Sequence, residues 1–138
     1  MNNLILLKNY IADAAIPANT LVKFSADGHV VPAASATDSI IGVSDNVAAA
    51  IGERVDVIRF GIAPVIYGGV VTRGDLLTTD ANGNAVSVTR HTHTENTAAA
   101  YTQNATTSTA SVVRIIGVAE ESGVAADIGS TTVQPSFA

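Results

Sequence analysis

The sequence predicts an all-β protein: a small β-barrel or sandwich built from two pseudo-repeats, with an N-terminal arm and a polar inserted loop. The apolar runs are short, rich in β-branched residues and bounded by glycine, proline, asparagine or aspartate, which is typical of strands. Two dipeptides, Asp27-Gly28 and Asn82-Gly83, are strong hairpin signals, and we expect type I′ turns there. A segment of the sequence also recurs, which indicates a duplicated unit.

Strands are expected wherever these apolar runs occur, and helical periodicity is hard to find. In the stretch 54–60 the side chains alternate, so Val55 and Val57 should face one way and Ile58 the other. The expected strands are residues 21–24, 29–32, 40–43, 54–60, 63–67, 76–79, 85–88, 112–118 and 131–134.

The repeat is the most informative feature of the sequence. Residues 21–31 (LVKFSADGHVV) match residues 76–86 (LLTTDANGNAV) at an offset of 55, and Ile-Ile-Gly-Val at 40–43 recurs at 115–118 at an offset of 75. Since 75 − 55 = 20, the second copy carries an insertion, which we place at 90–110. This insertion is rich in threonine, alanine and asparagine, so it cannot supply core and should form an exposed loop.

Two features recur at equivalent positions of the repeat. Gly42 and Gly117 occupy the same place, which predicts a bend or a close approach of two strands. Alanine-rich connections at 46–50 and 122–126 are candidates for short helical turns.

The repeat also suggests how the chain is organised. We expect an N-terminal arm at residues 1–15 and a single β domain at 16–138. Repeat one spans about 16–67 and repeat two about 71–134, with the insertion at 90–110. Each copy is too short to form a stable fold alone, so the two should pair around one core.

Composition excludes several classes of function. The chain has 138 residues, 7 basic and 12 acidic side chains and a formal net charge of −5, so it is a poor nucleic-acid binder. It has no cysteine, which excludes disulfides and thiol chemistry, and no apolar stretch long enough for a membrane span or a secretory signal. Only 14% of the residues are charged, which favours a protein that sits against other protein.

The sequence shows no convincing chemical site, and we expect no catalytic, cofactor-binding or metal-binding residues. His91, His93 and Glu95 alternate and could share one face of a strand, but they lie in the polar insertion and are expected to be solvated. His29 follows a turn and is expected to be solvated, and Asp75 is expected to be a turn residue.

The N-terminal segment is the best candidate for an interaction site. Leu4, Ile5, Leu6, Leu7 and Tyr10 precede the first repeat and have no counterpart before the second. One interpretation is an extra strand that covers the protein's own core. The other is an arm that adds to a neighbour's sheet edge, and on this interpretation these five residues contact a neighbouring protein subunit.

Three segments together resemble the capsid cement (decoration) proteins of tailed bacteriophages. They are IPANTLVKF at 16–24, GDLLTTDANGNAV at 74–86 and IIGVA at 115–119. The resemblance covers roughly residues 15–134, and the ordered combination is more specific than any one motif. The long insertion and the closing strand, which is poor in large apolar residues, depart from the family pattern.

The resemblance implies a β-rich protein without enzymatic activity that binds the outer face of an expanded phage head. The expected partners are the major capsid protein and further copies of the chain, as a trimer rather than a dimer, with neither nucleic acid nor membrane. The protein would be made in the host cytoplasm and function on the virion. The alternative is a barrel module of a fibre or spike that recognises a host glycan, although the chain has no tryptophan. A third possibility is an enzyme-associated β-clip domain.

Overall fold

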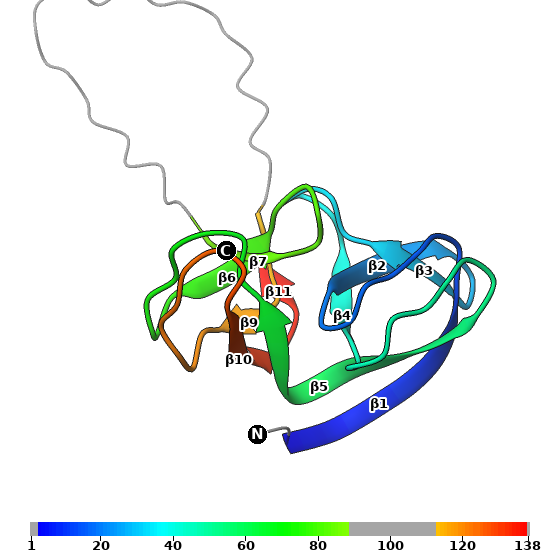
Figure 1. Cartoon of the computed structure of the whole chain (residues 1–138), viewed down its shortest axis with the longest axis horizontal. Coiled ribbons are helices and arrows are strands. Elements are labelled where there is room, and N and C mark those ends of the chain that lie inside the picture. Colours follow the sequence, from blue (N-terminus) through cyan, green and yellow to red (C-terminus); the bar gives the residue numbers. More distant parts are fainter. Residues whose placement is uncertain (1–2, 89–112, 138) are drawn as a thin grey trace, which may run out of the picture.

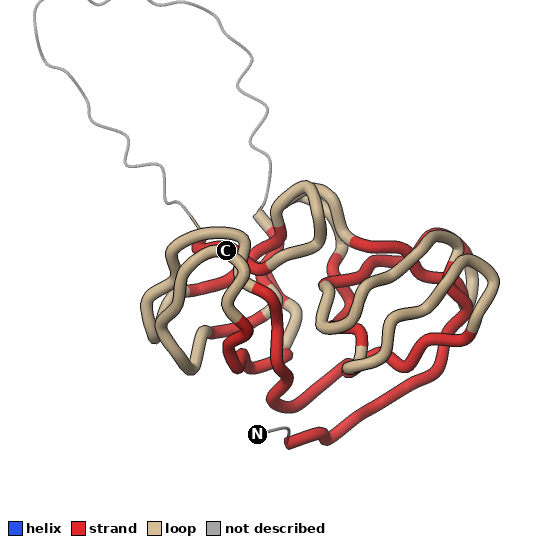
Figure 2. The backbone as a smooth tube through the Cα atoms, viewed as in Figure 1, coloured by secondary structure: helices blue, strands red, loops and turns tan. Residues whose placement is uncertain are grey.

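The computed structural model describes residues 3–88 and 113–137, and the described chain is all-β (Figure 1, Figure 2). The side chains of Asn3, Leu4 and Phe137 fall outside the description, as do the predicted insertion at 90–110 and the histidines within it. The strands are β1 Asn3–Ala12, β2 Leu21–Ala26, β3 His29–Pro32, β4 Ile40–Ser44, β5 Arg54–Ile66, β6 Leu76–Thr79, β7 Ala85–Ser87, β8 Arg114–Ile115, β9 Gly117–Val118, β10 Ile128–Val133 and β11 Ser136–Phe137.

Five strands close into a small barrel, which we call the first lobe. The hydrogen-bonded order is β1-β3-β2-β4-β5, and β1 also pairs with β5 to complete the circle. The β1–β5 ladder is antiparallel and runs from Asn3 opposite Ile62 to Ile11 opposite Arg54. By contrast, β1 meets β3 only at Ile11 and Ala12, so the barrel is narrowly closed on that side. The barrel class predicted from the sequence is confirmed.

The strand β5 belongs to both halves of the molecule. Its first part pairs with β1 and β4, and its last part, from Gly61 to Ile66, pairs with β10. β6, β7 and β9 form a further three-stranded sheet, and β8 pairs with β11. These strands and the end of β5 form the second lobe, which lies beside the first in Figure 1.

The two lobes repeat the same pairing pattern. In the first lobe, Ala12 of β1 pairs in parallel with Val30. In the second, Tyr67 pairs in parallel with Ala85, and both residues lie 55 positions further along the chain. The N-terminal segment, which has no counterpart in the sequence repeat, therefore has a structural one in the end of β5.

The buried apolar side chains form two clusters, in place of the single core expected from the sequence. Adjacent residues of one strand enter different clusters because side chains alternate across a strand: Leu21 joins one and Val22 the other. The inner cluster fills the barrel of the first lobe and contains Tyr10, Ala12, Ile16, Val22, Val30, Ile41, Ala49, Val55 and Val57. The shared cluster draws on both lobes and contains Leu21, Ala33, Ile40, Val43, Ile58, Ala63, Val65, Tyr67, Val71, Leu77, Ala85, Ile116, Ala119 and Val133.

The predicted alternation in β5 is confirmed, because Val55 and Val57 enter the inner cluster and Ile58 the shared one. The predicted close approach at the two equivalent glycines is confirmed as well. A β-carbon on Gly42 would lie 2.2 Å from the carbonyl oxygen of Ile58, where only glycine lets the strands meet.

Two local predictions are wrong. Both hairpins form, but Gly28 and Gly83 adopt positive φ while Asp27 and Asn82 do not, so the turns are not type I′. A bulge between Phe24 and Ala26 adjusts the first hairpin instead. The connections 46–50 and 122–126 are not helical; each contributes one isolated β-bridge. In the described chain, no helix could span a membrane.

Candidate functional site

The N-terminal half of β1 places large apolar side chains on the surface. Ile5, Leu6 and Leu7 are 70%, 52% and 41% exposed, although their strand is paired with β5. Phe60, opposite Leu6 on β5, is 42% exposed. We call these four residues the β1 apolar patch. Several large exposed apolar side chains along one short strand segment make that segment a candidate protein–protein contact.

Two bulges shape the β1 apolar patch. The ladder steps from Leu4 opposite Gly61 to Leu6 opposite Phe60, which leaves Ile5 without a partner residue. It then steps from Leu6 opposite Phe60 to Leu7 opposite Ile58, which leaves Arg59 without one. Bulges twist a strand and redirect side chains, so the regular alternation between core and surface is interrupted there.

Tyr10, the last of the predicted contact residues, is only 3% exposed and belongs to the inner cluster. Its ring meets that of Phe24 edge to face, with the centroids 5.5 Å apart. This part of the prediction is corrected: Tyr10 is a core residue of its own barrel and not a surface contact. Leu4 has no described side chain, so the three predicted contacts at the surface are Ile5, Leu6 and Leu7.

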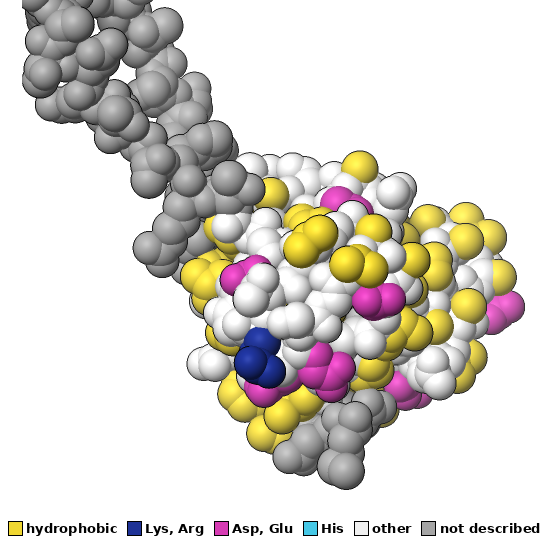
Figure 3. Space-filling view, turned by 60° about the vertical axis from the view of Figure 1, so that its left-hand side comes forward, with side chains coloured by type: hydrophobic (Ala, Val, Ile, Leu, Met, Phe, Trp, Pro, Cys, Tyr) yellow, Lys and Arg dark blue, Asp and Glu magenta, His cyan; other side chains and the backbone are white. Residues whose placement is uncertain are grey.

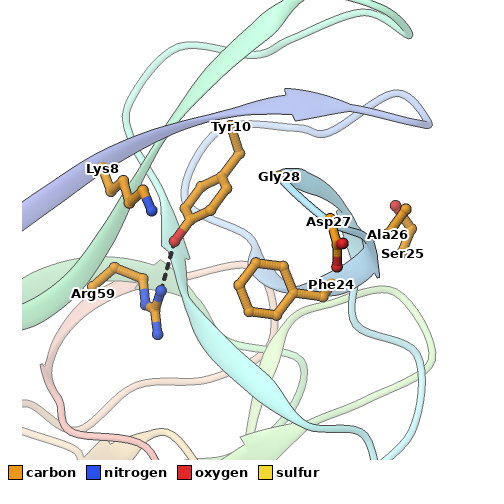
Figure 4. A pocket seen from close by; sticks show the side chains of 8 residues that line it. All are labelled: Lys8, Tyr10, Phe24, Ser25, Ala26, Asp27, Gly28 and Arg59. Atoms are coloured by element: carbon orange, nitrogen blue, oxygen red, sulfur yellow. Dashed lines mark hydrogen bonds between the residues drawn. The ribbon is translucent and has the colours of Figure 1, made fainter.

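A pocket of about 450 Å³ opens next to this segment, between β1, β5 and the β2–β3 turn (Figure 4). Lys8, Tyr10, Phe24 and Arg59 extend toward one another in it, and Asp27 lies on the turn side. Arg59 donates a hydrogen bond to the Tyr10 hydroxyl. The pocket is missing from the sequence-based prediction because its walls come from strands far apart in sequence.

Cations sit over both aromatic rings of the pocket. The Lys8 Nζ lies 5.3 Å from the centroid of the Tyr10 ring. The Arg59 guanidinium carbon lies 5.7 Å from that of Phe24. At these distances the negative face of each ring attracts the cation. The rings thus hold the two cations in place without neutralising them.

A serine, a histidine and an aspartate meet on the surface of the first lobe, but not in a catalytic order. The Ser25 hydroxyl donates to Asp13 Oδ2 at 2.6 Å, and His29 Nδ1 lies 2.7 Å from Asp13 Oδ1. These bonds, that from Ser25 first, lower the pKa of Asp13. Nucleophilic catalysis needs a serine bonded to the histidine, whereas here both bond to the aspartate.

The other polar residues considered from the sequence act in turns or lie outside the description. Asp75 Oδ2 accepts hydrogen bonds from the Ser87 hydroxyl at 2.7 Å and the Thr72 amide at 2.9 Å, which lower the pKa of its carboxyl group. This matches the predicted turn. His91 and His93 are not described, and within residues 3–88 and 113–137 no three metal-ligating side chains come together.

Comparison with known proteins identifies a family and a solved structure that are similar to this chain. The sequence model of a family described as phage cement protein matches residues 7–117. Among solved structures, the head fiber gp8.5 N base of bacteriophage phi29 is similar, with a TM-score of 0.64 and 17% identity over 94% of this chain and 93% of that one. At this identity the similarity shows a shared fold alone. No curated protein matches the chain significantly.

The family model matches all of the described strands except the start of β1, the last residue of β9, β10 and β11. The match begins at Leu7, in the middle of β1, includes all of β2 to β8 and ends at the first residue of β9. It therefore spans the first lobe and much of the second, and well over half of the 138 residues. The chain belongs to the phage cement protein family.

Proposed function

We propose that the protein binds the outer surface of an assembled phage head and stabilises the shell by bridging neighbouring subunits of the major capsid protein. The match to the phage cement protein family carries this proposal. A cement protein acts through many copies. Once a copy is bound to the shell through one contact, its second contact site is held close to the neighbouring subunit, which raises the effective concentration for that second contact. The role is structural and involves no catalysis.

The surface of the molecule supports a role at protein seams. On the face shown in Figure 3, apolar and uncharged side chains cover most of the described surface, and Lys and Arg are scarce. The cores of protein–protein interfaces are likewise depleted of charge. We propose the β1 apolar patch as a contact with the capsid or with a neighbouring copy, because it is exposed and because one edge of β1 before Ile11 has no partner strand in the described chain.

The oligomeric state belongs to the same proposal. A trimer would match a local three-fold position of an icosahedral shell, and a dimer would match a two-fold position. We favour the trimer. In either case each copy would present its β1 apolar patch in the same way, because closed symmetric assemblies use equivalent surfaces.

A barrel module of a head fibre that recognises a host glycan is the second candidate, because the phi29 head fiber base has a similar fold. Glycan sites commonly stack sugars on exposed aromatic rings. In the described chain, Tyr67 is buried and each ring of the pocket has a cation over it, which leaves Phe60, 42% exposed, as the one described ring available for stacking. The surface therefore supports the cement role better than the glycan role.

Co-sedimentation tests the proposal. The purified full chain is mixed with expanded, decoration-free shells of the phage that encodes it, and the bound copies are counted. Saturable binding with a copy number that matches the local three-fold positions supports the cement role and the trimer; two-fold positions would favour the dimer. No binding, or a handful of copies per particle, would overturn the cement role and favour the fibre module.

A further inference from the structure

The pocket beside β1 has an open sheet edge along one side. β1 pairs with β3 only at Ile11 and Ala12, and residues Asn3 to Tyr10 have no strand partner in the described chain on the edge opposite β5. The pocket opens where β1 separates from the β2–β3 hairpin, as Figure 4 shows. An extended peptide could therefore lie along β1 and reach into the pocket with a side chain.

The pocket holds two basic side chains, Lys8 and Arg59, and one acidic side chain, Asp27, at its rim. The ion pairs among the described residues are Lys23 with Asp38 and His29 with Asp13. Lys8 and Arg59 have no such partner there, although the chain has only 7 basic side chains and a net charge of −5. Two basic side chains held together in an acidic protein create a local attraction for an anion.

The cationic groups are already positioned. Arg59 is the extra residue of a bulge, which directs it out of the regular ladder, and it is bonded to the hydroxyl of Tyr10. Tyr10 is 3% exposed and fixed in the inner cluster. Binding an anion here would cost less side-chain entropy than binding it at two free surface cations.

The surroundings decide which anion fits. The rings of Tyr10 and Phe24 line the pocket beside the two cations, and Phe24 is 46% exposed, so the ligand should carry apolar groups beside its charge. The guanidinium fork suits a carboxylate. A nucleic-acid backbone, with its many phosphates, is disfavoured by the net charge of −5. An acidic sugar would find a cation already over each ring, Lys8 over Tyr10 and Arg59 over Phe24.

We propose that this pocket is a carboxylate-binding site that receives an aspartate or glutamate side chain from an extended, partly apolar segment of the major capsid protein. The identity of the partner rests on the proposed function, whereas the chemistry of the pocket does not. The site adds a polar, register-fixing contact to the β1 apolar patch. Charge pairs of this kind set the orientation of a complex and its rate of association.

A titration of the free protein tests the pocket without any capsid. The probe is the peptide acetyl-Leu-Glu-Leu-Glu-Leu-amide, and its control replaces both glutamates by glutamine. We expect saturable NMR shift changes at the Arg59 side chain and the Phe24 ring with the glutamate peptide only. The variant Lys8→Gln/Arg59→Gln should weaken binding on the order of tenfold. The charge-matched variant Arg54→Gln/Arg73→Gln, whose side chains lie outside the pocket, should bind as the unmodified protein does.

Each contrary result has a definite meaning. No shifts with the glutamate peptide, or equal shifts with both peptides, would overturn the carboxylate site. Shifts with sodium glucuronate at the same residues, stronger than with the peptide, would overturn the peptide ligand in favour of an acidic sugar. If the peptide binds as expected but the unmodified chain does not bind decoration-free shells, the proposed function fails while the pocket stands.

Discussion

Gly117 and Thr132 touch through their backbones: a β-carbon on Gly117 would lie 1.7 Å from the Thr132 carbonyl oxygen. Gly117→Ala should therefore push β9 away from β10 and lower the free energy of unfolding by about 2–3 kcal/mol. Gly69→Ala is the control, because nothing lies within 4 Å of its β-carbon position. Urea denaturation of both variants checks the prediction, and equal stabilities would contradict it.

Ala126 has φ of 74°, a conformation in which a β-carbon is strained. Gly52, which precedes the corresponding closing strand in the first lobe, has φ of 85°. Ala126→Gly should consequently raise the free energy of unfolding by about 0.5–1 kcal/mol, although glycine gains entropy in the unfolded chain. Ala125→Gly has no such strain to relieve and should be destabilising. A thermal melt in which both substitutions destabilise would refute this interpretation.

Tyr67 is fully buried, and its hydroxyl donates a hydrogen bond of 2.8 Å to the carbonyl oxygen of Glu121. Tyr67→Phe should lower the free energy of unfolding at pH 7 by about 1 kcal/mol, because the carbonyl loses its donor. Circular dichroism during urea titration measures this difference. A Tyr67→Phe variant with the same free energy of unfolding as the unmodified protein at pH 7 would show that the hydrogen bond contributes nothing to stability.

The same tyrosine predicts a pH dependence. Burial, and then the charge of Glu121, raise the pKa of Tyr67 above its ordinary value of 10.0. The contribution of the neutral Tyr67 side chain to the free energy of unfolding is complete below pH 10.0. It is lost as pH rises through the folded-state pKa, because Tyr67 ionises at lower pH in the unfolded chain than in the folded one. The stability gap between the unmodified protein and Tyr67→Phe should thus narrow above pH 10.0, and a constant gap would contradict the assignment.

Asp38 organises the loop before β4. Burial opposes its ionisation, but the amides of Ala34 and Ser35 and the ammonium of Lys23 outweigh it, so the pKa of Asp38 is lowered from 3.8. The stabilisation is present above pH 3.8 and is lost as pH falls through the lowered pKa. Asp38→Asn should cost about 1 kcal/mol at pH 7 and progressively less in acid. Asp27→Asn is the control, and a pH-independent cost for Asp38→Asn would refute the assignment.

The β1 apolar patch can be tested apart from folding. Ile5→Ser/Leu6→Ser replaces two exposed side chains, so the melting temperature should change little while binding to decoration-free shells weakens on the order of tenfold or more. Val47→Ser/Ile51→Ser removes two side chains that are 73% and 72% exposed elsewhere on the molecule. Sedimentation with shells compares the two variants. Equal binding by both would exclude the patch from the contact.

Local chemistry made part of this fold predictable. The hairpins at Gly28 and Gly83 and the close approach at Gly42 follow from single residues and their immediate neighbours. The predicted strands 54–60 and 63–67 leave a gap that begins at Gly61, yet β5 runs through it as one strand. Glycine can adopt the φ of 122° that continues the strand at this position. A glycine thus signals special geometry, but the sequence does not tell whether a strand ends or bends at it.

Of the candidate site, the sequence predicts the apolar segment of β1 but not the pocket beside it. The short run from Leu4 to Leu7 is visible in the sequence, but the partnership of Lys8 with Arg59 depends on the register of β1 against β5. Two bulges set that register, and no local pattern announces them. For the same reason, Tyr10 is buried although it stands only a few positions after exposed leucines.

The continuity of β5 has a mechanical consequence. Its 13 residues run from one lobe to the other as a single strand, with β1 on one edge and β4 and β10 on the other. A hinge between the lobes would require this strand to unzip from its neighbours. Tension applied to the first lobe passes instead along the β5 backbone, and the antiparallel ladders resist it in shear, with many hydrogen bonds loaded at once. We therefore expect the two lobes to move together as one rigid unit under load.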